Sequence, residues 1–183
     1  NRVLEGRVEM DDVYLGGQRT GGKVGRGAEN KVSLVAAVQT TADGKPVAMC
    51  LNMQPFTKAA MADFARRHLS VKSCVVSDGL KCFAAVQSVG IEHERVVTGG
   101  GVHSVKLPQF KAINTVLGNL KTAITGTYHA FDFAKYGHRY LAQVQYLFNR
   151  RFNLGIILVR LLRAAALTTR QTERKLRLAE VHR

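Results

Sequence analysis

The sequence contains few cysteines, and their pattern suggests neither a disulfide framework nor a zinc site. There are three, Cys50, Cys74 and Cys82. Their number is odd, and no two of them have the spacing of a zinc finger. All three lie in apolar stretches, so we interpret them as buried free thiols, which suits a reducing cytosol.

The sequence also lacks a hydrophobic run long enough to cross a membrane. Its longest apolar stretch, residues 154–167, is interrupted by Arg160 and Arg163. That stretch is too short and too charged for a membrane span. Residues 1–7 lead straight into a polar strand and do not have the pattern of a signal peptide. We therefore expect a soluble cytoplasmic protein with no membrane partner.

Acidic residues are scarce. The 183 residues include 13 Asp and Glu against 27 Lys and Arg, which gives a formal net charge of +14. Such an excess favours a polyanionic partner, nucleic acid above all, over charge that serves only solubility. The chain is otherwise of ordinary globular composition, with 46% hydrophobic residues, and its length suits one compact domain.

Hydrophobic patterning predicts a mixed α/β fold in which helices pack on a mixed sheet. Three strands joined by loops come first and indicate an antiparallel meander, and helices and short strands then alternate. The expected strands are 8–15, 31–40, 46–53, 73–77 and 95–98. The expected helices are 57–69, 80–89 closed by Gly90, 109–125 ended by Gly126, and 132–151, with a helical pattern from 154 onward. We assign residues 1–153 to the main domain and 154–183 to a basic helical extension of it.

Two of the expected helices have one apolar face each. The first is formed by Phe110, Ile113, Leu117, Leu120 and Ile124. The second is formed by Phe133, Tyr136, Tyr140, Val144 and Leu147. Both helices are therefore expected to pack against the sheet or against each other.

Two aspartates occupy unusual positions. Asp11 lies inside a strand, where acids are depleted, and Asp78 lies at the end of another strand. Carboxylates on neighbouring strands can converge on Mg²⁺, which prefers oxygen ligands. Two such ions about 4 Å apart can clamp the attacking and leaving oxygens of a phosphoryl transfer. On spacing alone, an exposed Asp11 and a turn residue at Asp78 are the favoured interpretation.

Asn114 and Lys121 are seven residues apart in the helix predicted for 109–125. They therefore share one side of that helix, about 10.5 Å apart along its axis. Asn114 borders the apolar face and can face the sheet, and Lys121 can reach a DNA phosphate. An ordinary polar flank is the alternative interpretation of both residues.

Four segments, in order, resemble the transposases of a bacterial insertion-sequence family over about residues 6–153. The segments are VEMDDVYLGG, VVSDG, INTVLGNLKTAITGTYH and YLFNRRFN. The family has a D-D-E or D-D-N catalytic triad followed by a lysine seven residues after its third member. Asp11 and Asp78 match the two aspartates, Asn114 the third position and Lys121 the lysine, so the resemblance makes these four residues catalytic and the first three metal ligands.

The resemblance implies an RNase-H-like fold and a metal-dependent reaction on DNA. Two Mg²⁺ or Mn²⁺ ions would assist cleavage at the element's end and then joining of the new 3′-OH to a target. The implied partners are double-stranded DNA, from element ends and target, and further copies of the chain in a homodimer or larger assembly. The implied location is the bacterial nucleoid.

Other residues receive supporting roles. We expect Asp12, on the strand face opposite Asp11, to lie behind the ligands or at the surface rather than bind metal. His103 can assist near the metals or simply be a surface residue. The candidates for DNA contact are Arg19, Lys23 and Arg26 in the glycine-rich segment 16–30, with Lys121, Tyr128, His129, Arg150 and Arg151. The alternatives are a plain flexible connector for the glycine-rich segment, helix-end packing for Tyr128 and His129, and a solvated basic helix end for Arg150 and Arg151.

Two departures from the family pattern keep other functions open. The third ligand is an asparagine, as in one subgroup, and its neutral amide should bind the second metal more weakly than a carboxylate would. Such transposases also usually carry an N-terminal DNA-recognition region, and this chain begins almost at the first motif, as a fragment would. The alternatives are a nuclease of the same fold that does not join strands, and a DNA-binding fragment without catalytic activity.

Overall fold

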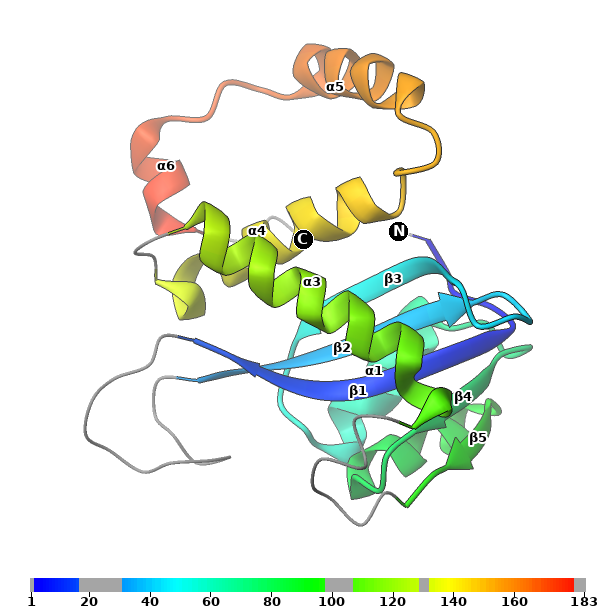
Figure 1. Ribbon diagram of the computed structural model, residues 1–183. Coiled ribbons are helices and arrows are strands. Elements are labelled where there is room, and N and C mark those ends of the chain that lie inside the picture. The colour runs from blue at the N-terminus through cyan, green and yellow to red at the C-terminus, as the bar shows by residue number, and fades with distance from the viewer. Residues whose placement is uncertain (1, 17–30, 98–106, 129–131, 180–183) are drawn as a thin grey trace.

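A five-stranded mixed sheet lies at the centre of the computed structural model, which describes residues 2–16, 31–97, 107–128 and 132–179 (Figure 1). The strands are β1 (Arg7–Leu15), β2 (Val32–Thr40), β3 (Pro46–Met53), β4 (Cys74–Ser77) and β5 (Glu92–Arg95). Their order is β3-β2-β1-β4-β5. β1, β2 and β3 pair antiparallel, and β4 pairs parallel with both β1 and β5. The predicted mixed α/β fold is confirmed, and it is compatible with an RNase-H-like architecture.

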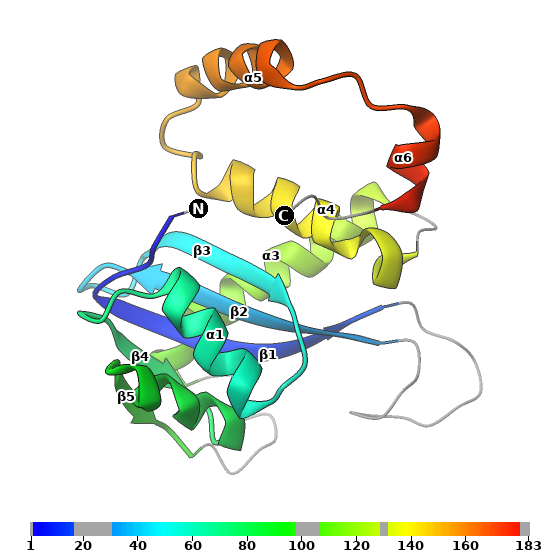
Figure 2. The same ribbon diagram turned by 180° about the vertical axis from the view of Figure 1, so that it is seen from behind.

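Helices cover both faces of this sheet. On one face lie α1 (Lys58–His68) and the 3-10 helix η1 (Lys81–Val89), and on the other α3 (Lys111–Thr127), which follows the short turn η2 (Pro108–Phe110) (Figures 1 and 2). The side chains of β1 alternate between the two faces of the sheet, so this strand contributes to the core on each face. Val8 and Met10 pack in the core beneath α1, whereas Val13 and Leu15 pack in the core beneath α3. The apolar face predicted for residues 110–124 is buried throughout in that second core.

Some predicted boundaries are wrong. The last strand is Glu92–Arg95 rather than 95–98, since its register is set by parallel pairing with β4, Cys74 to Glu92 through Ser77 to Arg95. The segment after Asp78 is a 3-10 helix rather than an α-helix, although Gly90 ends it as predicted, with a left-handed φ of 81°. Gly126 does not end α3, which continues to Thr127.

The helix α4 (Phe133–Phe148) buries a different face from the one predicted. Its buried residues are Phe133, Gly137 and Leu141, and Leu147 is 48% exposed. Gly137 decides this, because a Cβ there would lie 2.8 Å from the Phe133 ring and 2.9 Å from the sulfur of Met53 on β3. The apolar pattern of the sequence could not predict this close approach of α4 to β3, because it depends on the absence of a side chain at Gly137.

The outer edge of β3 is covered by side chains from the C-terminal end of α4. The N–H of Met49 donates to Oδ1 of Asn149 at 2.7 Å, and Nδ2 of Asn149 donates to the Met49 carbonyl at 2.9 Å. Gln145 accepts from the N–H of Leu51 at 2.7 Å. These amides take the place of a sixth strand and block an edge that would otherwise be open to another chain.

We expect Asn149→Ala to lower the free energy of unfolding by about 1–3 kcal/mol, since a part-buried N–H and carbonyl of Met49 would lose their partners. Urea unfolding measures the effect. The control is Asn153→Ala, which removes an exposed amide four residues later. Equal stability losses in the two variants would contradict the edge-covering role.

The C-terminal residues form two further helices, as their pattern predicted: α5 (Gly155–Leu167) and α6 (Glu173–Leu178). α6 is tied to α4, because Tyr136 and Arg139 donate to the carbonyls of Arg177 and Leu176 at 3.2 and 3.0 Å. None of the residues of α5 is buried. Among the described residues, no helix has both the length and the apolar character that crossing a bilayer requires.

Candidate functional site

The pairing of β1 with β4 brings the two predicted aspartates together. β1 is the central strand, and its parallel register with β4 sets Met10 beside Ser77. The next residue on each strand is the aspartate, Asp11 within β1 and Asp78 just past the end of β4. Sequence order alone separates these residues widely, and the strand pairing makes them neighbours.

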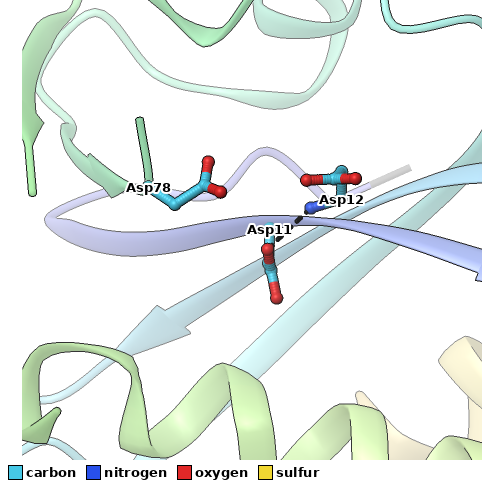
Figure 3. A group of neighbouring side chains, drawn as sticks. All are labelled: Asp11, Asp12 and Asp78. Carbon is cyan, nitrogen blue, oxygen red and sulfur yellow. Dashed lines mark hydrogen bonds between the residues drawn. The ribbon is translucent and has the colours of Figure 1, made fainter. Parts of the chain in front are cut away.

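Three carboxylates meet at this point. One oxygen each from Asp11, Asp12 and Asp78 lies within 4.8 Å of the others, which is close enough for a shared cation. Figure 3 shows Asp11 extending from β1 toward α3, with Asp12 and Asp78 across the strand. Oxygen ligands from carboxylates are the kind that hard divalent cations prefer.

The carboxylate of Asp12 lies closer to those of Asp11 and Asp78 than we expected from the sequence. Strand alternation correctly places it on the other side of β1 from Asp11 (Figure 3). Its carboxylate nevertheless reaches the shared cluster, because it sits at the point where β1 runs past the end of β4. The expectation that Asp12 lies behind the ligands or at the surface therefore understated its proximity to the cluster.

The charge of Asp11 is poorly stabilised in the protein alone. Burial, together with the neighbouring charges of Asp12 and Asp78, raises the pKa of its carboxyl to about 7. The hydrogen bond that its Oδ1 accepts from the N–H of Asp12, at 2.9 Å, opposes this, as does the charge of Lys121. A bound divalent cation would supply the missing positive charge, so the residues present fit a metal ion.

The Asp78 side chain is held by its own turn. Its Oδ1 accepts the N–H of Leu80 at 3.0 Å. The turn is tied to β5, since Arg95 donates to the carbonyl of Gly79 at 3.0 Å. This bonding fixes one carboxylate oxygen of Asp78, whose side chain lies on the same side of β1 as Asp12 (Figure 3).

The helix α3 brings the other two predicted catalytic residues to the same face of the sheet as Asp11. Asn114 is half-buried and follows the fully buried Ile113. Lys121 is exposed, and its charge acts on Asp11, whose pKa it lowers. Metal binding by Asn114 and phosphate binding by Lys121 stay predictions.

Three of the residues predicted to contact DNA have structural partners in the described part of the chain. The ring of Tyr128 contacts that of Tyr140 in a tilted arrangement, with ring centroids 4.1 Å apart, and its hydroxyl donates to Gln143 at 3.1 Å. Arg151 donates to the carbonyls of Pro46 and Val47 on β3, the latter at 3.1 Å. Arg150 lies over the ring of Tyr146, 3.8 Å from its centroid. Packing thus accounts for much of their placement, and DNA contact stays a prediction.

Five further predicted residues lie outside the described residues: Arg19, Lys23, Arg26, His103 and His129. The sequence interpretation also missed two groups that matter to the site's frame. Glu9 is buried two residues before Asp11, and Gln145 and Asn149 cover β3. An acid inside an apolar strand, as at Glu9, was a detectable signal.

The cysteines take no part in this cluster. All three are thiols outside any disulfide, as expected, with Cys50 and Cys82 buried and Cys74 half-buried. Burial raises the pKa of the Cys50 thiol to about 12. That thiol is therefore protonated near neutral pH and unreactive.

A carboxylate cluster beside the central strands of a mixed sheet, in a strongly basic chain, is compatible with an enzyme that processes nucleic acid. The sequence pattern of the ISXO2-like transposase domain matches residues 3–149, which is most of the chain. The chain therefore belongs to this family of insertion-sequence transposases, which are enzymes of nuclease and transferase type acting on DNA. No match was found among functionally curated proteins.

Proposed function

We propose that this protein is a D-D-N transposase that cleaves the ends of an insertion sequence and joins them to target DNA, with divalent metal. The observation that carries the proposal is the cluster of three carboxylate oxygens, within 4.8 Å of one another, at the point where β1 runs past the end of β4. Family membership and the net charge of +14 support DNA as the substrate.

Asp11, Asp78 and the amide oxygen of Asn114 would hold two Mg²⁺ or Mn²⁺ ions, with Asp12 near enough to assist. When bound, such ions polarise the phosphodiester and lower the pKa of water or of a 3′-OH. The neutral Asn114 contributes less charge than a glutamate would, so we infer weaker binding of the second ion. No aspartate or glutamate lies between Glu94 and Asp132 to replace it.

The chain's own residues bind and orient the DNA. Lys121, exposed on α3 near Asp11, is placed to pair with a phosphate beside the cluster. Arginines at the end of α4 and the basic residues of α5 and α6 extend a positive surface for the rest of the duplex. Because hydroxyl groups of water and DNA act as nucleophiles, no protein side chain needs to form a covalent bond to DNA.

The proposal is tested by incubating the protein with end-labelled element DNA and a plasmid target in Mg²⁺ or Mn²⁺. Joined products are the expected outcome. Cut but unjoined ends would identify a nuclease instead. Affinity for DNA that falls with salt, without any cleavage, would identify a binding module.

Assembly on two DNA ends calls for a second copy of the chain, and α5 supports one. Leu158, Leu161 and Leu162 are each 62% exposed and share one face of this helix. In an antiparallel pair centred between Leu161 and Leu162, Leu158 faces Ala165 of the second copy. Leu161 faces Leu162 of the second copy, and each contact occurs twice about the axis, as a self-complementary two-fold interface requires.

We expect the protein to dimerise without DNA, and more strongly as salt rises, because salt screens the repulsion between two basic copies. Sedimentation velocity measures this. Leu161→Gln should give a monomer, whereas the control Leu167→Gln, on the other face of α5, should stay dimeric. Identical behaviour of both variants, or a monomeric wild type, would remove α5 as the interface.

A further inference from the structure

Glu9 has a carboxylate side chain in a fully buried position. It lies on β1, 1% exposed, and burying a carboxylate is costly unless hydrogen bonds and opposite charge compensate. Both oxygens have such partners. Oε1 accepts from Nη1 of Arg7 at 2.7 Å, and Oε2 accepts from the backbone N–H of Ile113 at 2.9 Å.

The bond to Ile113 supplies what the start of α3 lacks. The first N–H groups of a helix have no partner within it, and the residue before α3, Phe110, makes no capping bond with its side chain. Glu9 therefore caps α3 from a strand more than a hundred residues away. Its negative charge also suits the positive end of the helix dipole.

Arg7 adds a second tie between the same two elements. Its Nη1 pairs with Glu9, and its Nη2 donates to the carbonyl of Gln109 at 3.0 Å, in the turn that precedes α3. We call Glu9, Arg7 and their bonds to Gln109 and Ile113 the β1–α3 clamp. The clamp fixes where α3 begins along β1.

The β1–α3 clamp connects the two elements that carry the candidate site, β1 with Asp11 and α3 with Asn114. Glu9 precedes Asp11 by two residues and so shares its strand face, and Ile113 directly precedes Asn114. We propose that Glu9 is a positioning residue, which holds Asn114 and Lys121 opposite Asp11 through the β1–α3 clamp. The inference rests on the proposed function in assuming that these residues form one metal and DNA site.

Misplacing reacting or binding groups by about 1 Å can cost about 100-fold in rate. Glu9→Leu removes the acceptor for Ile113 and the partner of Arg7. We expect it to lower Mn²⁺-dependent cleavage about 100-fold and to raise the Mn²⁺ concentration needed for half-saturation. Glu9→Gln keeps an amide oxygen for Ile113 and should stay within about tenfold of wild type, a rescue by the conservative variant. The matched control is Glu92→Gln, which removes an exposed carboxylate from β5.

Two readouts do not depend on cleavage. Mn²⁺ titration followed by electron paramagnetic resonance reports binding at the site, and amide hydrogen exchange reports opening of the first turn of α3, residues 111–115. Weaker Mn²⁺ binding and faster exchange there in Glu9→Leu, but not in Glu92→Gln, are expected. If wild type binds Mn²⁺ but cuts no DNA, the proposed function fails while these readouts still decide the role of Glu9.

Wild-type Mn²⁺ binding and wild-type exchange in folded Glu9→Leu would overturn the proposal. Should that variant not fold, as circular dichroism would show, Arg7→Gln breaks the clamp at its exposed side and takes its place. A smaller change in the same direction is then expected. Unchanged Mn²⁺ binding in Arg7→Gln would overturn the proposal equally.

Discussion

Alanine at Asp11 or at Asp78 is expected to abolish cleavage, with a loss of more than about 10³-fold, or about 4 kcal/mol in the activation barrier. Each change removes a carboxylate from a cluster whose oxygens lie within 4.8 Å of one another. The binding of DNA should persist or tighten, because removing a negative charge favours a polyanion. End-labelled DNA measures cleavage, and electrophoretic mobility shift measures affinity.

The control for both variants is Asp63→Ala, which removes an exposed carboxylate on α1, away from the cluster. It should cleave at the wild-type rate. Undiminished metal-dependent cleavage by the Asp11 or the Asp78 variant would refute the assignment of that residue as a ligand.

The second large effect is a dependence of stability on pH. The pKa of Asp11 is about 7 in the folded protein and about 3.9 in the unfolded chain. Between about pH 4 and pH 7 the folded state holds a proton that the unfolded state has released. The free energy of unfolding therefore falls as pH rises through this window and levels off above pH 7. Asp11→Asn, which carries no charge, should reduce this fall and be the more stable protein at pH 8 without metal.

Added Mg²⁺ should reverse that ranking. A ligand that binds only the folded state stabilises it in proportion to its occupancy, so millimolar Mg²⁺ should stabilise the wild type at pH 8 and leave Asp11→Asn almost unchanged. Urea unfolding at pH 5 and pH 8, with and without Mg²⁺, measures both effects. Equal stabilisation of the two proteins by Mg²⁺, or a less stable metal-free variant at pH 8, would contradict the metal site.

The two proposals share one physical basis, which is the cost of buried negative charge. The charge of Asp11 is not compensated by the protein, as its raised pKa indicates, and a bound cation would therefore be stabilised by it. Glu9, two residues earlier on the same face, has its charge balanced by Arg7 and by the start of α3. One strand thus carries one acid that is satisfied by the protein and one that is not.

Much of the frame of the site could be predicted from local sequence. Alternation in residues 8–15 assigns Glu9, Asp11 and Val13 to one strand face, and the 110–124 stripe identifies the buried face of α3, because both patterns depend only on backbone geometry. The resemblance then singled out Asp11 and Asp78. The family match confirms the family, and the roles of these two residues stay predictions. For Asn114 and Lys121 the sequence could give only the shared side of a helix.

The sequence by itself determined the strongly basic chain, the order of most strands and helices, and the aspartates placed where acids are otherwise rare. Only the tertiary structure decided that Asp12 reaches the cluster, that Gly137 lets α4 approach β3, and that Glu9 and Asn149 bond to backbone about a hundred residues away. The reason is that periodicity reports the direction of a side chain from its own element. Hydrogen bonds, burial and charge depend on which distant element that direction meets.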